Sequence, residues 1–223
     1  MRVLVLLGAP GAGKGTQAEI LAPRLNLLHL ATGDMFRAAA EQGTPIGLEA
    51  KAYMDRGELV PDDVTVRMLL ERLTAPDARQ GVLLDGFPRT PAQAGVLDAA
   101  LAERNARVEE AILIDVPPEE LVRRLSGRLV CRAEGHIYNE ISKPPRVPGI
   151  CDIDGSELYE REDDKVETIR ARLRQQVPDL LEVCDHYRAQ GKLRSVDGTR
   201  PIDEVTEELV AALTQASGSA LTW

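Results

Sequence analysis

The stretch GAPGAGKGT at residues 8–16 decides the fold class, because its glycines and lysine stand between two regular elements. An apolar run, VLVLL at 3–7, precedes it, and a helical pattern at 14–24 follows. The spacing G-x-x-x-x-G-K in this context predicts a phosphate-binding loop, since glycines let backbone N–H groups approach phosphate oxygens. The helix N-terminus adds partial positive charge, and Lys14 can reach the β- and γ-phosphates. A glycine-rich turn without a ligand is the alternative, and the flanking strand and helix disfavour it.

Short apolar runs alternate with helical patterns along the rest of the chain. Strands are predicted at 3–7, 27–30, 82–84, 111–116 and 193–196, and helices at 14–24, 34–55, 62–74, 91–104, 118–125, 164–189 and 202–215. Continuously apolar strands joined by helical crossovers are typical of a parallel sheet buried on both faces. We therefore expect an α/β fold with a five-stranded parallel P-loop sheet flanked by helices. Pro178 is expected to kink or split its helix.

The segment 126–161 interrupts this alternation and predicts a small inserted lid. It has no helical period, contains four glycines and three prolines, and includes two of the three cysteines. A second separate piece is expected at 34–62, because glycines and Pro61 mark its ends. The predicted organisation is a core at 1–33, 63–125 and 162–223, a helical segment at 34–62 and a lid at 126–161.

Composition excludes several function classes. The chain has 223 residues, 43% of them hydrophobic and 28% charged, which indicates a globular protein rather than a disordered or coiled-coil one. A net charge of −9 argues against duplex binding, and one Trp, four Tyr and two Phe argue against a base-stacking platform. The early apolar run is too short for a signal peptide or a membrane span. Three cysteines without a secretion signal favour the cytoplasm.

Several motifs, taken together in chain order, resemble the adenylate kinase family. They are GAPGAGKGTQ at 8–17, ATGDMFR at 31–37, DGFPRT at 85–90, GRLV at 127–130, EREDD at 160–164 and DGTRP at 197–201. The match covers nearly the whole chain and includes the long lid of the bacterial type. It implies reversible phosphoryl transfer, in which Mg·ATP and AMP give two ADP, by a monomer that acts on small nucleotides.

The resemblance also implies which residues hold the substrates. The cations around the transferring phosphoryl group are Lys14, Arg89, Arg128, Arg161 and Arg172. The implied ATP-binding residues are Gly11, Ala12, Gly13, Lys14, Gly15, Thr16, Arg124, Arg128 and Arg200. The implied AMP-binding residues are Thr32, Arg37, Leu59, Val60, Gly86, Arg89, Gln93, Arg161 and Arg172.

Elementary chemistry supports these assignments. Transfer between two nucleotides gathers many negative charges, which calls for converging arginines, although any one arginine alone would be read as part of a solvated helix face. The Thr32 hydroxyl can donate a hydrogen bond to the monophosphate nucleotide, and the Gln93 amide can pair with an adenine ring nitrogen and its amine. A surface polar residue is the alternative for Gln93. Asp163 and Asp164 are expected to orient the arginines or to act as acids at a helix N-terminus.

Two residues point to Mg²⁺. Asp85 ends the apolar strand VLLD at 82–85, where it would hold the ion through water. An aspartyl-phosphate nucleophile is an alternative role that the upstream phosphate loop disfavours. Gly15 follows the loop lysine, so the usual hydroxyl ligand is displaced to Thr16. The acceptor phosphate is already ionised, so no general base is needed, and His29 and His186 are interpreted as structural or surface residues.

The lid carries a candidate zinc site. Relatives with a long lid often have C-x2-C-x16-C-x2-C or a version that ends in Asp, and this chain has Cys131, Glu134, Cys151 and Asp154 at that spacing. His136 is an alternative to Glu134, because four anionic ligands leave a net charge of −2 to be offset. A metal-free lid held by hydrogen bonds is the remaining alternative.

Three rival functions stay open. A UMP/CMP-type nucleoside monophosphate kinase is the nearest, and the long lid with Leu59, Val60 and Gln93 favours adenine over it. A nucleotide-hydrolysing switch would need Ser or Thr after the loop lysine and a guanine-reading N-K-x-D motif, and the sequence has neither. A zinc-ribbon binding module would leave the complete phosphate loop without a purpose.

Overall fold

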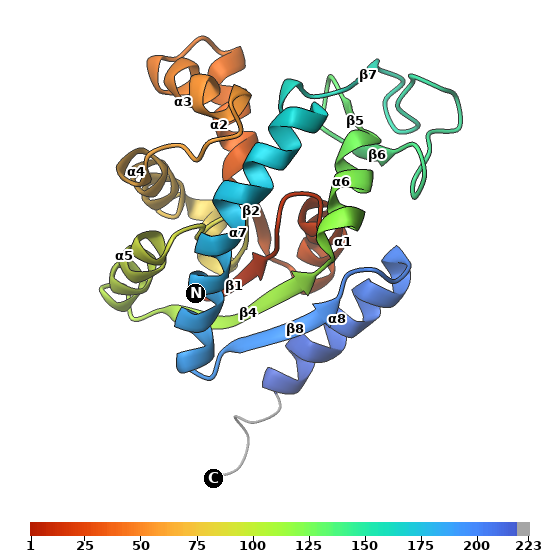
Figure 1. Ribbon diagram of the computed structural model, residues 1–223. Coiled ribbons are helices and arrows are strands. Elements are labelled where there is room, and N and C mark those ends of the chain that lie inside the picture. The colour runs from red at the N-terminus through yellow and green to blue at the C-terminus, as the bar shows by residue number, and fades with distance from the viewer. Residues whose placement is uncertain (218–223) are drawn as a thin grey trace.

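The computed structural model of the chain describes residues 1–217 (Figure 1). The strands are β1 (Arg2–Leu7), β2 (Leu28–Ala31), β3 (Val82–Asp85), β4 (Arg107–Asp115), β5 (Arg128–Cys131), β6 (Ile137–Asn139), β7 (Leu158–Tyr159) and β8 (Leu193–Asp197). The α-helices are α1 (Lys14–Leu25), α2 (Thr32–Glu41), α3 (Pro45–Asp55), α4 (Asp62–Arg72), α5 (Pro91–Ala102), α6 (Pro118–Ser126), α7 (Val166–Ala189) and α8 (Ile202–Ser217). Short 3₁₀ helices are η1 (Pro76–Gln80) and η2 (Glu162–Asp164). Within this part of the chain, no helix is long and apolar enough to cross a membrane.

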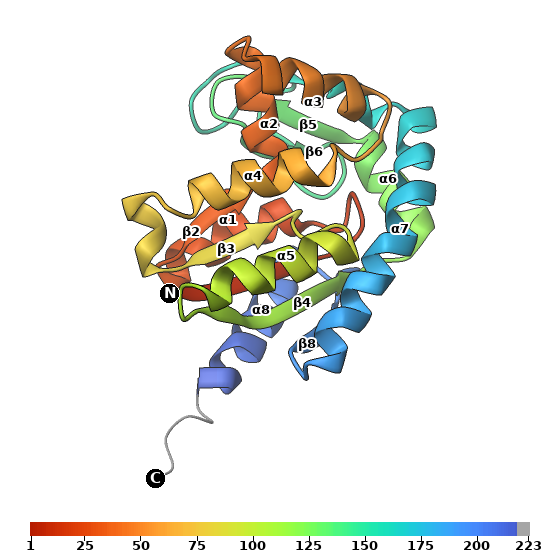
Figure 2. The same ribbon diagram turned by 90° about the vertical axis from the view of Figure 1, so that its left-hand side faces the viewer.

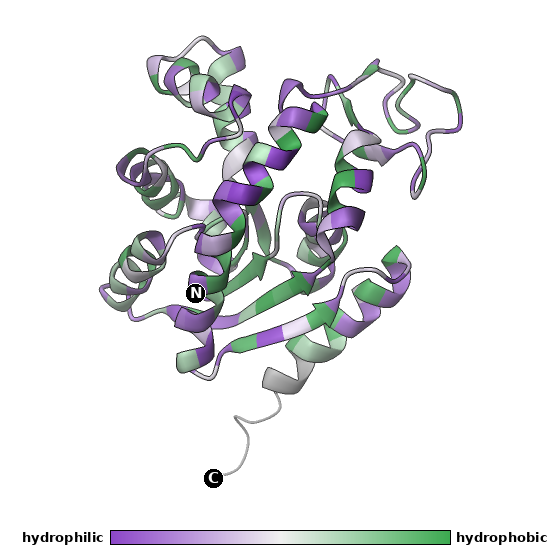
Figure 3. Cartoon of the chain, viewed as in Figure 1, coloured by the Kyte–Doolittle hydropathy of each residue, from purple (hydrophilic) through white to green (hydrophobic). Residues whose placement is uncertain are grey.

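The main sheet has the order β2-β3-β1-β4-β8, with all neighbouring strands parallel in the described residues. Successive residues of β1 point to opposite faces, so Val3 and Val5 join one core and Leu4 and Leu6 the other. Helices α4, α5 and α7 cover the first face, and α1 and α8 the second (Figure 2). Green predominates in the middle of the main sheet, although β8 carries purple and white stretches, while much of the outward surface of the helices is purple (Figure 3). The predicted five-stranded parallel sheet flanked by helices is confirmed.

Two helix predictions need correction. The single helix expected at 34–55 is two helices, α2 and α3, because the chain turns at Gly43 with φ 69°. Thr44 then caps α3, its hydroxyl accepting a hydrogen bond from Gly47 N at 3.2 Å. The other correction concerns Pro178, which does not split its helix, since α7 continues through it for 24 residues. Buried side chains on both sides of the proline, such as Ile169 and Val183, hold α7 against the rest of the protein.

Two smaller units rise above the carboxyl ends of the main strands (Figure 1). The segment 126–161 leaves α6 and forms a three-stranded antiparallel sheet of order β6-β5-β7 before the chain enters α7. Its own small core contains Cys131, Tyr138, Cys151 and Leu158. Helices α2 and α3 pack together around a separate cluster that includes Phe36, Ala50 and Val60. Both units therefore have a hydrophobic core apart from the main one.

Candidate active site at the carboxyl ends of the strands

A cavity of about 750 Å³ lies between the main sheet, the pair α2–α3 and the segment 126–161, and we call it the central cavity. It lies where β1 and β3 end, which is the side of an open α/β sheet that binds ligands. The predicted site residues that line it are Gly11, Ala12, Gly13, Lys14, Gly15, Thr16, Thr32, Arg37, Leu59, Val60, Asp85, Arg89, Gln93, Arg124, Arg128, Arg161, Arg172 and Arg200. Gly86 borders an adjacent cavity of about 60 Å³ together with Lys14 and Arg89.

The loop at 8–16 has a backbone that only glycine suits well. Gly11 and Gly13 have φ values of 86° and 98°, and a Cβ on Gly11 would lie 2.8 Å from Leu125 Cγ. Lys14 folds over the loop and donates to the carbonyls of Gly8 at 2.8 Å and Ala9 at 3.1 Å. Burial lowers the pKa of Lys14 to about 8, an effect that Asp85 opposes and Arg89 reinforces.

The cavity arginines come from four different elements, and acids hold most of them in place. Arg128 of β5 forms a bidentate pair with the fully buried Asp164, at 2.6 and 2.5 Å. Arg172 of α7 contacts Asp163 at 2.9 Å and Asp164 at 3.3 Å. Such forks fix a guanidinium in one orientation. The two aspartates thus orient arginines.

A second acid joins the helical segment to the end of segment 126–161. Asp34 of α2 accepts from Arg37 at 2.5 Å and from Arg161 at 3.3 Å. Arg161 is only 8% exposed, and its Nε has no hydrogen-bond partner among the described residues. Burial lowers the pKa of Arg161 to about 10, with repulsion from Arg37 next in size. A buried donor without a partner, facing other cations, is suited to an anionic ligand.

Arg89 follows β3 and lines the central cavity beside these cations. Its Nε donates to the Gly86 carbonyl at 2.6 Å. Burial lowers the pKa of Arg89 to about 10, and repulsion from Arg172 adds to the effect. The Thr32 hydroxyl donates to that same carbonyl at 2.9 Å, so the turns after β2 and β3 are joined here.

Gln93 is buried at 1% exposure, so the surface alternative for this residue is wrong. Its Oε1 accepts from Arg89 N at 2.8 Å, and its Nε2 donates to Asp62 at 2.7 Å. Leu59 and Val60 line the same part of the cavity. Two arginines lie toward the opposite side: Arg124 bonds Glu120 at 2.8 Å, and the exposed Arg200 lies 3.2 Å from Glu208.

Sequence reasoning missed the contact between His29, which does not line the central cavity among the described residues, and Asp85, which does. His29 Nε2 lies 3.4 Å from Asp85 Oδ2, because β2 and β3 are neighbours in the sheet. Burial alone would lower the pKa of His29, but the hydrogen bond and the charge of Asp85 outweigh it and raise that pKa. Only the strand order reveals this proximity. His186 instead bonds Asp98 at 2.8 Å, away from the cavity.

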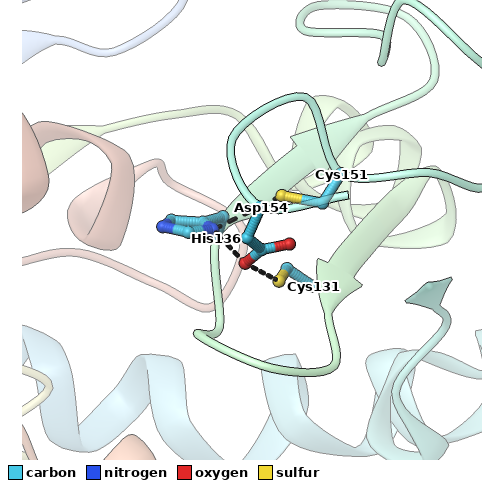
Figure 4. A group of neighbouring side chains, drawn as sticks. All are labelled: Cys131, His136, Cys151 and Asp154. Atoms are coloured by element: carbon cyan, nitrogen blue, oxygen red, sulfur yellow. Dashed lines mark hydrogen bonds and ion pairs between the residues drawn. The ribbon is translucent and has the colours of Figure 1, made fainter. Parts of the chain in front are cut away.

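A cluster of possible metal ligands lies in the segment 126–161, and we call it the cysteine cluster (Figure 4). Cys131, His136, Cys151 and Asp154 each offer one ligand atom, and these atoms all lie within 4.8 Å of one another. Asp154 Oδ2 lies 3.0 Å from Cys131 Sγ and 3.3 Å from His136 Nδ1. His136 Nδ1 is also 3.4 Å from Cys151 Sγ. Two thiols, an imidazole and a carboxylate are a donor set that suits tetrahedral zinc.

Among the residues that the structure describes, Glu134 does not belong to the cysteine cluster. Glu134 is exposed, and its backbone N–H donates to Cys131 Sγ at 3.4 Å. The turn after β5 thus brings His136, rather than Glu134, to the other three groups. A neutral imidazole in place of a carboxylate also removes one negative charge from the set.

Comparisons with known proteins agree with the motifs. The family model described as adenylate kinase matches residues 6–192. A relative named adenylate kinase from Exiguobacterium sibiricum is 51% identical over 210 residues, which cover 94% of this chain and 98% of the relative. Relatives of the same name from Carboxydothermus hydrogenoformans and Staphylococcus epidermidis are 49% and 48% identical over the same shares of both chains. The chain therefore belongs to the adenylate kinase family.

Proposed function

We propose that this chain is a phosphotransferase that moves the γ-phosphoryl group of Mg·ATP to AMP and gives two ADP reversibly. The observation that carries this proposal is one cavity in which the phosphate loop faces five arginines, namely Arg37, Arg89, Arg128, Arg161 and Arg172. Hydrolases that bind a single nucleotide have no need of a second set of phosphate-binding cations on the far side of the loop. Relatives named adenylate kinase support the same reaction.

The proposed roles follow from where each cation lies. The loop glycines 11, 13 and 15, with Ala12 and Thr16, bind the ATP phosphates through backbone N–H groups, and Lys14 bridges toward the transferred group. Arg124 and Arg200 lie on the ATP side, where Arg124 is placed to stack on the base. Arg37 and Arg89 clamp the AMP phosphate near Thr32 and Gly86, while Leu59, Val60 and Gln93 contact its base.

Arg128, Arg161 and Arg172 join Lys14 and Arg89 around the reacting phosphoryl group. They neutralise the charge that spreads over its oxygens as the bond to the leaving ADP lengthens. No protein base takes a proton, because the attacking oxygen belongs to an ionised phosphate. Catalysis then consists of alignment and charge stabilisation.

A magnesium ion fits the part of the central cavity that Asp85 and Thr16 line. Asp85 and Thr16 both line it, and oxygen ligands that leave room for water suit this ion. The bound ion would neutralise phosphate charge and orient the ATP oxygens. In this proposal Asp85 holds it through water, and His29 keeps the Asp85 carboxylate in place from the other side.

We further propose that the helical segment 34–62 and the lid 126–161 move against a core formed by 1–33, 63–125 and 162–223. Closure would exclude water, which would otherwise accept the phosphoryl group and hydrolyse ATP. The pair of Asp34 with Arg161 joins the first of these pieces to the end of the second. Closed alignment of this kind supports transfer over hydrolysis.

An assay of ADP formation from ATP with AMP, UMP, CMP and GMP in turn tests the reaction. We expect AMP to be preferred by at least about tenfold in kcat/KM, the scale of a hydrogen-bonded base reader. A preference for UMP or CMP would replace the proposal by the pyrimidine-specific alternative. ATP hydrolysis independent of any monophosphate would contradict phosphotransfer.

We also propose that the cysteine cluster binds one zinc ion through Cys131, His136, Cys151 and Asp154. Tyr138 supports it, since its hydroxyl lies 3.5 Å from Cys151 Sγ and accepts from Asp152 N at 2.8 Å. With two thiolates, one carboxylate and a neutral histidine, the site would carry a net charge of −1. Bound zinc would link the turn between β5 and β6 to the loop that precedes β7, and so stabilise the lid sheet.

Elemental analysis of protein purified without chelator tests the metal and its ligands. We expect about one equivalent of zinc in the wild type and in Glu134→Gln, and a strong loss in His136→Ala. Glu134→Gln is the matched control, because it changes the other candidate ligand in the same turn. Zinc loss in Glu134→Gln but not in His136→Ala would reverse the assignment, and no zinc after reconstitution would leave a metal-free lid.

The remaining proposals concern the setting of the enzyme. All the proposed nucleotide-binding residues line cavities within one chain, which supports a monomer. The net charge of −9 supports small nucleotides rather than nucleic acid or an anionic membrane surface as partners. The cysteines Cys131, Cys151 and Cys184 form no disulfide, which supports a cytoplasmic location. Light scattering of the purified protein tests the monomer directly.

A further inference from the structure

The Gln93 side chain is held at both ends before any base arrives. Its Oε1 accepts from Arg89 N at 2.8 Å, and its Nε2 donates to Asp62 Oδ1 at 2.7 Å. Both partners can fill only one role, because a backbone N–H only donates and an ionised carboxylate only accepts. A flipped amide would place Nε2 against a donor and Oε1 against an acceptor. One orientation of the Gln93 amide is therefore selected.

Asp62 is itself fixed by a second contact. Its Oδ2 accepts from the Thr90 hydroxyl at 2.8 Å, and that hydroxyl in turn accepts from Gln93 N at 3.2 Å, as the cap of α5. The carboxylate thus joins the first turn of α4 to the first turn of α5, two helices that lie side by side (Figure 2). In the described part of the chain, Gln93 lines the central cavity and Asp62 does not, so Asp62 acts on a ligand indirectly, and its bond to Gln93 is the direct route.

A locked amide still has one free hydrogen-bonding position at each end. Oε1 keeps one lone pair and Nε2 keeps one hydrogen. Adenine presents an amine donor beside a ring-nitrogen acceptor, which matches this pair. A 6-oxopurine presents a carbonyl acceptor beside an N–H donor, the reverse pattern. A freely rotating glutamine would accept either base by turning over, whereas the locked one accepts only the first.

We propose that Asp62 is a specificity-determining positioning residue, which locks the Gln93 amide so that the site accepts a 6-aminopurine and rejects a 6-oxopurine. This proposal rests on the function proposed above. It assigns the discrimination to the carboxylate character of Asp62, in addition to the presence of Gln93. An amide or hydroxyl at position 62 could donate as well as accept, and would release the Nε2 end of the Gln93 amide, leaving Arg89 N–H as the one remaining constraint among the described residues.

The test compares AMP with IMP, which has nearly the same shape but carries the reversed hydrogen-bonding edge. In Asp62→Asn we expect the ratio of kcat/KM for AMP to that for IMP to fall by at least about tenfold, since the contact at position 62 then tolerates either amide orientation and only the Arg89 N–H still opposes the flipped one. KM for ATP should stay unchanged. Asp62→Glu keeps an acceptor-only group and is expected to retain most of the ratio.

Asp63→Asn is the matched control. It makes the same charge change in the first turn of α4 at an exposed position, so it reproduces any effect on the helix dipole without touching Gln93. Its AMP-to-IMP ratio should equal that of the wild type. Because both substrates are assayed on one preparation, an inactive fraction cancels from the ratio. If Asp62→Asn yields no folded protein, Asp62→Ser serves instead, since serine is favourable at a helix start.

The outcomes distinguish a failure of the Asp62 proposal from a failure of the proposed function. An AMP-to-IMP ratio in Asp62→Asn within twofold of the wild type, or IMP turnover still below detection, would overturn the lock. A fall of equal size in Asp63→Asn would assign the effect to helix charge and overturn it as well. Absence of ADP formation from ATP and AMP in the wild type would instead refute the proposed function.

Discussion

At the scale of single residues, the central cavity holds its cations close together and balances them with buried acids. Arg128 and Arg172 share Asp164, and Arg161 shares Asp34 with Arg37. This arrangement keeps guanidinium groups oriented while the cavity is free of phosphate. Burial lowers the pKa values of Lys14, Arg89 and Arg161, so each of these cations is expected to gain when an anion binds.

Arg89→Ala should therefore reduce kcat by a factor of about 10²–10³, because no neighbour can take over its donors to the developing charge. Folding should survive, since Arg89 faces the cavity and not the apolar core. The measurement is steady-state ADP formation alongside thermal unfolding. Arg79→Ala, at an exposed arginine of η1, is the control and should keep full activity. Near-normal turnover in purified Arg89→Ala would contradict its role.

Asp163 gives a prediction about pH. Its burial opposes ionisation, but the charges of Arg172 and Arg128 outweigh burial and lower its pKa. A carboxylate with a lowered pKa in the folded state contributes stability above its ordinary pKa, and this stability is lost as pH falls through the folded value. Asp163→Asn should therefore lower the free energy of unfolding by about 3 kcal/mol at pH 7, with the difference shrinking below pH 4.

Urea unfolding between pH 7 and pH 3.5 measures this difference. Glu162→Gln is the neighbouring control, because that glutamate forms an exposed ion pair with Lys165 and its substitution is expected to change stability little. A wild-type advantage over Asp163→Asn that stayed constant down to the lowest pH would show that ionised Asp163 is not its source.

At the scale of elements, the contact between α2 and α3 depends on one glycine. A Cβ on Gly47 would overlap the backbone of Ala39 and Ala40, so α3 could not keep its place against α2. Gly47→Ala should destabilise the protein by about 1–3 kcal/mol and raise KM for AMP more than KM for ATP. Displacement of α3 is expected to disturb the helical segment, which we assign to AMP.

Gly95→Ala is the matched control on α5. A Cβ there would meet nothing within 4 Å, so this change should stabilise the protein by about 0.4–1 kcal/mol. Thermal unfolding and the two KM values measure both variants. Equal increases in KM for ATP and AMP in Gly47→Ala would contradict a separate AMP side.

The elements also show what could be read from sequence. Local signals sufficed for the phosphate loop, the five strands of the main sheet and the helix at 91–104, because glycine spacing, apolar runs and caps act over a few residues. The pair of His29 with Asp85 depends on strand order, and the bond of Gln93 to Asp62 joins residues 31 positions apart. The turn that brings His136 to the cysteines depends on β5 and β6 pairing. The first two contacts leave no local pattern, whereas the sequence did offer His136 as an alternative ligand without deciding between it and Glu134.

Pro178 and Gly43 show the same limit in secondary structure. Proline removes a helical hydrogen bond, yet tertiary packing of α7 keeps the helix continuous. The prediction of one helix at 34–55 did not take Gly43 into account, although its positive φ ends α2 and lets Thr44 begin α3. Packing decided the first outcome, and backbone freedom decided the second.

At the scale of the whole molecule, contacts join the segment 126–161 to both other parts of the cavity. Ile137 of β6 reaches the phosphate loop, where a Cβ on Gly15 would lie 2.9 Å from Ile137 Cδ1. Arg161 bonds Asp34 of α2 at 3.3 Å. Each of these contacts is small, as the proposed opening and closure require.

Binding of both substrates should therefore favour closure and slow hydrogen exchange in the lid and in the helical segment. The probe is a single molecule with two adenosines linked by a chain of phosphates, which fills both nucleotide positions at once and gathers the arginines. We expect backbone amides in 126–161 and 34–62 to exchange more slowly in its presence, while amides of the central strand β4 change little, because they are already buried.

AMP alone should protect 34–62 more than 126–161. Unchanged exchange in the lid with the two-headed ligand bound would contradict closure, and equal slowing in β4 would indicate global stabilisation instead.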